Sequence, residues 1–187
     1  MPAHQHGRRF FAPVLVGSAL LATALPAHAA HTDAAAALPT TNAVMLVNAE
    51  TGKCLTIAGG RSTANNMNAV QFDCDTDRSR RWTLNRVGRG QTYQIRNSQT
   101  GKCLTIEGGR STADNVRAVQ FTCDRDRSRR WTIRQVASNG QYQIRNNRTG
   151  KCLTIAGGRS TANNVEALQF TCDNDRSRRW LLRLTGR

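Results

Sequence analysis

Residues 48–82 read NAETGKCLTIAGGRSTANNMNAVQFDCDTDRSRRW, and almost the same sequence returns at residues 97–131 and again at 146–180. The three copies align without a gap at a period of 49 residues, and 26 of the 35 positions carry one residue in all three. A period of this length is typical of domains in which copies of one small unit pack around a shared core. The repeat therefore predicts a pseudo-threefold domain, in which a site made by one copy is made three times.

Within each copy, short β-prone runs alternate with turn residues such as Gly, Asn, Asp and Ser. In the second copy the predicted strands cover residues 93–96, 102–106, 118–121 and 131–136, with turns or loops at 98–101, 108–109, 114–115 and 124–127. No stretch shows a sustained apolar period of about 3.6 residues, which would indicate a helix. Four strands in each of three repeats make about twelve short strands, which in one pseudo-threefold domain favour a β-trefoil over a β-sandwich.

The six cysteines fall two to a repeat, and the two members of each pair are 20 residues apart. One bridge within each repeat is the simplest arrangement that keeps the copies equivalent. The predicted disulfides are Cys54–Cys74, Cys103–Cys123 and Cys152–Cys172. Each would close a loop of about 20 residues and stabilise the fold by roughly 3 kcal/mol. A metal site is not expected, because the chain has no CxxC motif and only one histidine, His31, beyond the N-terminal segment described next.

The N-terminus has the pattern of a secretory signal peptide. Arg8 and Arg9 precede an apolar run at 10–25, and the small residues around Ala29 favour cleavage after that position. We therefore interpret residues 1–29 as a signal peptide of a secreted protein. The arginine pair leaves both the Sec and the twin-arginine export routes open.

The remaining chain divides into a short linker and one domain. Residues 30–42 are mostly small and show no face to bury, so they are the predicted linker. The domain is expected to cover 43–187, with repeats at about 43–91, 92–140 and 141–187. No later stretch is long and apolar enough to insert into a membrane.

Strand parity predicts which side chains of a repeat share a face. In the run 54–57, Leu55 and Ile57 point to one side, and Thr56 points to the other together with the cysteine. Phe72 lies two residues before the second cysteine and so falls on the side of Thr56. We expect Thr56, Phe72 and the disulfide to meet on one face, with Leu55 and Ile57 in the shared core.

The same parity places two further residues inside. Trp82 closes the repeat and is expected to join the shared core. Gln71 is also directed inward, where its amide needs hydrogen-bond partners. A β-bulge at Gln71 would change which side chains of the hairpin point inward.

Charge indicates one class of partner. Without Arg8 and Arg9, 25 basic residues face 12 acidic ones, a net charge of +13. Such a surplus predicts attraction to anionic surfaces and polymers. It is also compatible with a secreted basic protein that is simply well solvated.

The motif Gly-Lys-Cys-Leu, a second Cys about twenty residues later and a closing Trp resemble the ricin-type β-trefoil. This is the fold of R-type lectins and of carbohydrate-binding modules attached to secreted bacterial glycosidases. The resemblance covers all three repeats, as at Cys54, Cys74 and Trp82. It implies carbohydrate binding by three near-equivalent sites.

The resemblance also implies which positions would contact the sugar. These candidates are Thr56, Phe72, Ser79 and Arg80, with the copies Thr105, Phe121, Ser128, Arg129, Thr154, Phe170, Ser177 and Arg178. The aromatic matches the family residue that stacks on the sugar ring. The polar positions differ: Thr56 stands for an Asp, Val70 for a Gln, and Ser79-Arg80 for Asn-Gln. The same changes in all copies indicate either duplication of an altered unit or a different ligand held three times.

The arginines allow two hypotheses. Arginine is suited to bidentate recognition of carboxylate, sulfate or phosphate, so a pocket with Phe72 and Arg80 could hold an acidic or sulfated glycan. Alternatively, Asp75 and Asp77 pair with the arginines that follow and fix a long loop. Both hypotheses stay open at this point.

Other classes of function fit less well. A hydrolase is disfavoured, because Glu50, Glu107 and Glu166 occupy unrelated positions of the repeat and cannot form a threefold acid/base pair. The two carboxylates of Asp75-x-Asp77 are too few oxygens for calcium. Nucleic-acid binding is disfavoured, because the aromatics have core spacing and make no exposed stacking stripe.

We therefore expect a secreted, monomeric β-trefoil that binds carbohydrate without catalysis, cofactor, metal or membrane insertion. The partner would be a glycan or polysaccharide, including acidic or other non-galactose glycans. The alternative is a basic β-trefoil that binds a protein target, as an inhibitor does, or an anionic polymer, with degenerate sugar sites.

Overall fold

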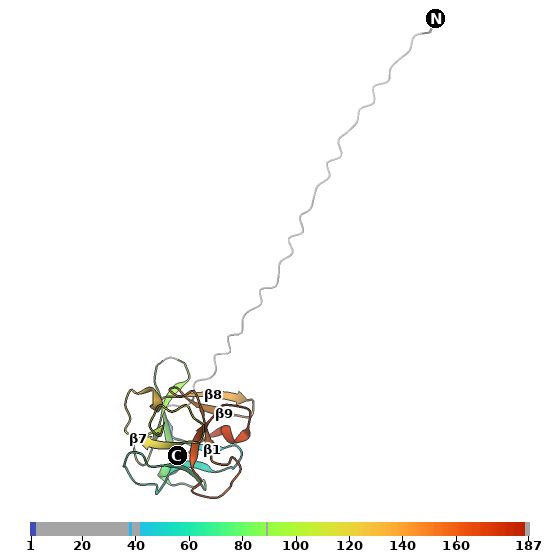
Figure 1. Ribbon diagram of the computed structural model, residues 1–187. Helices are drawn as coiled ribbons and strands as arrows, with labels where there is room; N and C mark the ends of the chain where they lie inside the picture. The colour runs from blue at the N-terminus through green and yellow to red at the C-terminus, as the bar shows by residue number, and fades with distance from the viewer. Residues whose placement is uncertain (3–37, 39–41, 89, 186–187) are drawn as a thin grey trace. The chain divides into compact units, whose positions relative to one another are not determined.

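The computed structural model describes residues 1–2, 38, 42–88 and 90–185 (Figure 1). Twelve β-strands lie in this part of the chain, four in each repeat, as the alternation of β-prone runs predicted. Among the described residues there is no α-helix, and three single 3-10 turns complete the secondary structure: η1 (Arg78–Arg80), η2 (Arg127–Arg129) and η3 (Arg176–Arg178). Apart from residues 1–2, the predicted signal peptide lies outside the described residues.

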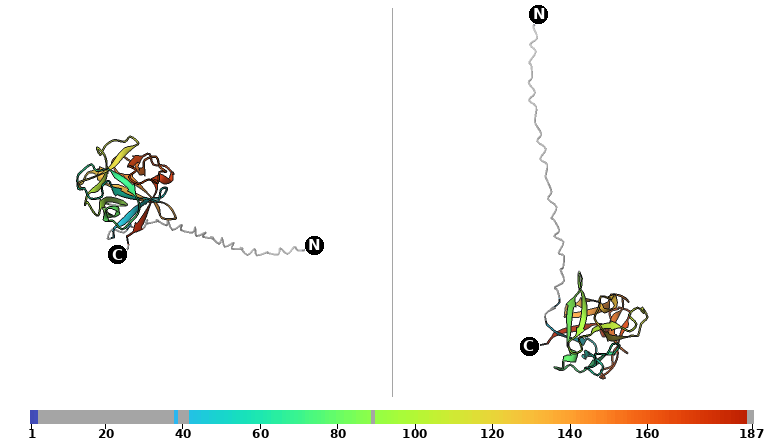
Figure 2. Two further views of the ribbon diagram at one scale, coloured as in Figure 1. Left: turned by 90° about the horizontal axis from the view of Figure 1, so that it is seen from below. Right: turned by 90° about the vertical axis from the view of Figure 1, so that its left-hand side faces the viewer.

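Six strands form a closed barrel. They are β1 (Val44–Asn48), β4 (Trp82–Arg86), β5 (Thr92–Asn97), β8 (Trp131–Ala137), β9 (Gln141–Asn146) and β12 (Trp180–Leu184). Around the ring the order is β1, β12, β9, β8, β5 and β4, and β4 pairs again with β1. Every pairing is antiparallel; β8 and β9 run side by side in Figure 1, and β1 (cyan) and β12 (red) do so in Figure 2.

The other six strands form three hairpins, one from each repeat. They are β2 (Cys54–Ile57) with β3 (Ala69–Phe72), β6 (Cys103–Ile106) with β7 (Val116–Phe121), and β10 (Cys152–Ile155) with β11 (Ala167–Phe170). The hairpins also pair with one another, since β7 is hydrogen-bonded to β11 and single bridges join Asn68 to Val119 and Val70 to Glu166. A six-stranded barrel with three joined hairpins is the predicted β-trefoil.

The core is built from equivalent residues of the three repeats. Trp82, Trp131 and Trp180 are fully buried, and each indole N–H donates to the carbonyl oxygen of a hairpin leucine at 2.9–3.0 Å. Leu55 and Ile57 lie in the same cluster. The tryptophans therefore link barrel to hairpin while burying large apolar surfaces.

The predicted face assignment is confirmed. Cys54 lies opposite Phe72, and Leu55 opposite Gln71, without a bulge in the hairpin. Residues directly opposite in an antiparallel pair share a face, so Phe72 falls on the side of the disulfide and Gln71 on the inner side. All three predicted disulfides are present, with Cα–Cα distances of 5.1, 5.0 and 5.1 Å.

One residue of the predicted linker behaves differently from the expectation. Leu38 is only 7% exposed, belongs to the core cluster, and lies with its N–H 3.4 Å from the hydroxyl of Tyr93. The expectation that segment 30–42 has nothing to bury is therefore wrong at this position. A single leucine among small residues gives no periodic pattern, which is why the sequence did not reveal it.

Candidate functional site

Each repeat has a surface hollow bounded by its own hairpin, its own 3-10 turn and a loop of another repeat. In the first repeat the hollow lies against Thr56 of β2, Phe72 of β3 and Arg80 of η1. The hollows of the three repeats have volumes of about 280, 360 and 260 Å³. An asparagine from another repeat closes each of them: Asn164, Asn66 and Asn115 in turn.

The loop that carries this asparagine is held by the buried glutamine of the hairpin. The side-chain amide of Gln71 donates to the carbonyl oxygens of Ser160 at 2.7 Å and Ala162 at 2.8 Å, and the backbone carbonyl of Gln71 accepts from the backbone N–H of Asn164 at 2.9 Å. Gln120 and Gln169 make the same amide contacts in the other repeats. Gln71 thus has the partners that its inward position required. The contribution of another repeat was not predicted; its only sequence signal is the unchanged Asn in all copies.

The predicted threonine and serine lie at the floor of the hollow and are turned into the protein. Thr56 is 3% exposed and Ser79 is 1% exposed. The Thr56 hydroxyl donates to the backbone oxygen of Ser79 at 3.1 Å, and the copies in the other repeats do the same at 3.0 and 3.2 Å. These hydroxyls connect the hairpin to the 3-10 turn. Ser128, unlike Ser79 and Ser177, is not part of the lining.

The 3-10 turn begins at an aspartate cap. The Asp77 carboxylate accepts from the N–H of Ser79 at 2.8 Å, and Asp126 and Asp175 cap the other two turns in the same way. A capping carboxylate satisfies an N–H that the turn itself leaves unpaired. This local bond orders the segment after the second cysteine, where the sequence predicted only a loop.

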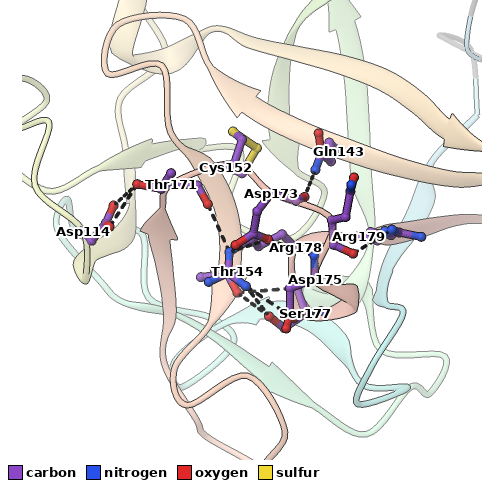
Figure 3. A network of polar contacts seen from close by, with 12 residues as sticks. Asp114, Gln143, Cys152, Thr154, Thr171, Asp173, Asp175, Ser177, Arg178 and Arg179 are labelled. Carbon is purple, nitrogen blue, oxygen red and sulfur yellow. Dashed lines mark hydrogen bonds and ion pairs between the residues drawn. A yellow bond between two sulfur atoms is a disulfide. The ribbon is translucent and has the colours of Figure 1, made fainter.

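The arginine of each turn is enclosed by two carboxylates and an aromatic ring. Figure 3 shows Arg178 between Asp173, at 3.4 Å, and Asp175, at 3.3 Å, while its Nη1 donates to the Ser177 hydroxyl at 3.3 Å. The guanidinium carbon lies 4.4 Å from the centre of the Phe170 ring. The same pairs occur at Arg80 and Arg129, which stack at 4.6 and 4.4 Å on their phenylalanines. The Asp–Arg pairing that one hypothesis predicted is therefore present in every repeat.

The side chains of the hollow that remain exposed to solvent include both negative and positive charges. The Asp77 side chain is 44% exposed, and Arg61 of the Gly-Gly-Arg loop lines the same hollow. The backbone N–H and then the hydroxyl of Ser79 hold the pKa of Asp77 below its ordinary value, so this carboxylate is charged at neutral pH. The hollow thus offers an anionic acceptor, cationic donors and a half-buried ring.

Replacing Arg80, Arg129 and Arg178 together by Gln is expected to lower stability by about 3 kcal/mol. Each change removes a cation–π contact and charged hydrogen bonds, together worth roughly 1 kcal/mol at a partly exposed site. For a domain of this size the melting temperature should fall by about 6–12 °C. Thermal unfolding by circular dichroism measures it.

The matched control removes three arginines that make no side-chain hydrogen bond or ion pair with described residues: Arg125, Arg134 and Arg183. Their replacement by Gln changes net charge equally and should shift the melting temperature by a few degrees at most. Equal shifts in both variants would contradict a bracing role.

The stability of the domain should also decrease at acidic pH. Interactions with Ser79, Ser128 and Ser177 hold the pKa values of the three capping aspartates below their ordinary value. An aspartate with a lowered folded-state pKa stabilises fully above its unfolded value of about 3.9, and the contribution disappears as pH falls through the folded value. Melting temperatures should therefore hold down to about pH 5 and fall below about pH 4. Replacing the three capping aspartates by Asn should flatten this dependence; an unchanged profile would contradict the assignment.

Within residues 42–88 and 90–185, no group of three or more His, Cys, Asp or Glu side chains is placed to hold a metal ion. In the same part of the chain, no helix has the length and apolar character needed to cross a membrane.

Comparison with solved structures gives the same fold. A designed threefold symmetric protein, ThreeFoil, superposes with a TM-score of 0.71 at 23% identity, over 75% of this chain and 97% of that one. An exo-β-1,3-galactanase from Clostridium thermocellum matches with a TM-score of 0.73 at 26% identity, over 79% of this chain but only 31% of the enzyme. The ricin B-like lectin of Macrolepiota procera, solved with lactose, matches with a TM-score of 0.66 at 18% identity, over 79% and 99% of the two chains.

A comparison with curated proteins gave no match. The model of the ricin-type beta-trefoil lectin domain, however, matches residues 42–183, most of the chain and all three repeats. The barrel, the three hairpins and the equivalent hollows agree with that match. This chain belongs to the ricin-type β-trefoil lectin domain family.

Proposed function

We propose that this protein is a secreted lectin that binds glycans in three near-equivalent hollows and catalyses no reaction. The observation that carries the proposal is the repetition of one hollow, lined in every repeat by the same ring and arginine, in a chain of a lectin family. The capping aspartate lines the first and third hollows as well. Carbohydrate sites combine an apolar ring with a few fixed polar groups, and each hollow offers this combination. The predicted signal peptide at 1–29 and the three disulfides support secretion.

The capping aspartate is our candidate for the main acceptor of sugar hydroxyls. Thr56 stands where the family has an aspartate, and its hydroxyl is committed to Ser79. Asp77 is charged, half exposed, and lines the same hollow at the start of η1. A carboxylate can accept two hydroxyl hydrogen bonds at once. Asp77 and its copies would then replace the missing family aspartate.

The alternative, a basic β-trefoil that binds a protein or an anionic polymer, rests on one specific observation. In each hollow the guanidinium lies over the phenylalanine ring, on a surface that a sugar would otherwise contact. If Arg80 stays there, the sugar must use the ring edge or displace the arginine. An acidic glycan is compatible both with a lectin family and with an arginine over the ring, because the arginine itself can donate hydrogen bonds to the glycan's acidic groups.

A glycan array with neutral, uronic-acid and sulfated sugars tests the proposal. We expect selective signals that are lost when Asp77, Asp126 and Asp175 are replaced by Ala, with the melting temperature recorded as the folding control. No signal above background on any glycan class would contradict carbohydrate binding. Signals proportional only to the negative charge of the glycan would favour the anionic-polymer alternative.

Binding to a polysaccharide is expected to exceed binding to its own monosaccharide by about 10²–10⁴-fold. Three sites on one rigid domain engage neighbouring units of a polymer at high effective concentration. Titrations that compare the polymer with its repeating sugar, per mole of sugar, measure the ratio. A variant with the Asp77 site alone intact should lose this gain, and equal affinities for both forms with the unaltered chain would contradict three cooperating sites.

A further inference from the structure

A second kind of hollow lies where one repeat joins the next, and none of the candidate sugar-site residues lines it. Between the first and second repeats its volume is about 420 Å³. The lining contains three arginines and no acidic or aromatic residue: Arg78, Arg81 and Arg96 from two repeats, with Ala43, Thr83, Asn97, Ser98 and Gly101. The junction of the second and third repeats has a smaller hollow of about 210 Å³ with Arg127 and Arg145.

Arg96 is held in place by the turn beside it. Its Nε donates to the carbonyl oxygen of Gly101 at 2.8 Å, and Arg145 donates to Gly150 at the same distance. A side chain on Gly101 would come within 3.2 Å of the Arg96 guanidinium, and the φ of +69° at this residue also favours glycine. The Arg96 side chain is therefore held in position before any ligand binds, and the outer edge of its guanidinium is exposed.

The other two arginines use few of their donors. The Nη2 of Arg78 donates to Ser98 O at 3.3 Å, and the Nη2 of Arg81 donates to Thr76 O at 2.7 Å. Each guanidinium has five N–H donors. The Nε of Arg81 and the hydroxyl of Ser98 are buried and have no partner among the described residues. Buried polar groups normally have one, so both groups are available to donate to a bound anion.

No carboxylate of the described residues forms an ion pair with Arg78, Arg81 or Arg96, in contrast to the arginines of the sugar-site hollows. Three cations around one hollow repel one another. An anion placed between them would relieve this repulsion and accept the unused donors.

The third junction, between the last and first repeats, keeps a buried Nε without a partner among the described residues, that of Arg179, but it has lost the strand arginine and the unpaired turn arginine. The pair Thr83–Arg96 of neighbouring strands becomes Leu181–Val47 there. Arg176, the copy of Arg78, is paired with Glu50 at 3.4 Å. The third junction therefore lacks the strand arginine, and it is also the junction at which a carboxylate of the protein, that of Glu50, pairs with the turn arginine.

We propose that the first two junctions are sites for the sulfate groups of an acidic polysaccharide, and that the third junction is not. A tetrahedral sulfate has enough oxygens to accept from all three arginines of the first junction, whereas a carboxylate has two. Nucleic acid fits less well, because no aromatic side chain lines either hollow to stack on a base. These sites are separate from the three hollows assigned to sugar. The outcome of a test of the junction sites therefore does not decide the proposed function.

The test is a titration of the full chain with sucrose octasulfate, a compact sulfated sugar, followed by calorimetry. The first two junctions should account for two bound molecules per chain, counted as the difference between the unaltered chain and the variant at Arg96 and Arg145. Replacing Arg96 and Arg145 by Gln should weaken binding about tenfold or more at each site, since a charged hydrogen bond is lost. The control changes Arg134 and Arg183, two exposed arginines outside both hollows, to Gln; with the same loss of charge it should weaken binding by less than about threefold.

Equal losses in the two variants would overturn the proposal, because attraction by net charge alone would explain them. An unchanged number of bound molecules in the Arg96 and Arg145 variant would overturn it too, as would tighter binding of a single-stranded oligonucleotide. If the Arg96 and Arg145 variant does not fold, the arginine Nε–H signals in the NMR spectrum of the unaltered chain test the two sites instead. On addition of sodium sulfate those of Arg96 and Arg145, which line the two hollows, should shift, and that of Arg179 at the third junction should not; unmoved signals at Arg96 and Arg145 would contradict the sites.

Discussion

Reduction and alkylation of the three disulfides is expected to unfold most of the domain at about 37 °C. Each bridge, such as Cys54–Cys74, closes a loop with a sequence separation of 20 residues. A loop of that length contributes roughly 3 kcal/mol by restricting the unfolded chain, so the three together contribute about 9 kcal/mol. This is comparable with the whole stability of a typical domain, about 5–15 kcal/mol.

Tryptophan fluorescence measures the effect directly, because Trp82, Trp131 and Trp180 are fully buried in the folded barrel. The control is the same alkylation without reductant, which should change nothing, since no cysteine is free. A reduced, alkylated protein with an unchanged melting temperature would contradict the role given to the bridges.

Replacing Gln71, Gln120 and Gln169 together by Leu is expected to lower stability by about 6 kcal/mol. Each glutamine is fully buried and satisfies two carbonyl oxygens of a loop from another repeat. Leaving such acceptors without a donor costs about 2 kcal/mol per site. The melting temperature should fall by about 12–24 °C, measured by thermal unfolding.

The matched comparison uses single changes. Gln71→Leu should destabilise by about 2 kcal/mol, whereas Gln99→Leu, on the exposed surface, should change stability by less than about 0.5 kcal/mol. The released loop carries Asn164, which closes the first sugar-site hollow, so glycan binding at that repeat should weaken as well. Equal melting temperatures for the two single variants would refute the role of the glutamine clamp.

The fold and the disulfides could be predicted because they follow from repetition and local parity. The spacing of Cys54 and Cys74 within each copy selected the bridges, and the alternation around Leu55 and Gln71 gave the faces of the hairpin. β7 begins at Val116, two residues earlier than predicted, because Val116 and Arg117 pair with β11. A pairing with a distant strand leaves no pattern in the local sequence.

The details of the site depended on side-chain positions that the sequence left open. The order Asp-x-Asp-Arg-Ser-Arg is equally compatible with an arginine directed to a ligand or to its own aspartates. In the structure Arg80 lies between Asp75 and Asp77 and over Phe72. The contribution of Asn164 comes from a residue 84 or more positions away from the other residues that line the hollow, so only the trefoil packing reveals it.

The central claim, that the three hollows bind glycan, is tested most directly by NMR of labelled phenylalanine. After residue 29 the chain has only three phenylalanines, Phe72, Phe121 and Phe170, and each lines one hollow. With the protein lacking residues 1–29, addition of a glycan selected by the array should shift all three ring signals in a saturable way. Saturable binding of that glycan with all three ring signals unmoved would contradict the claim.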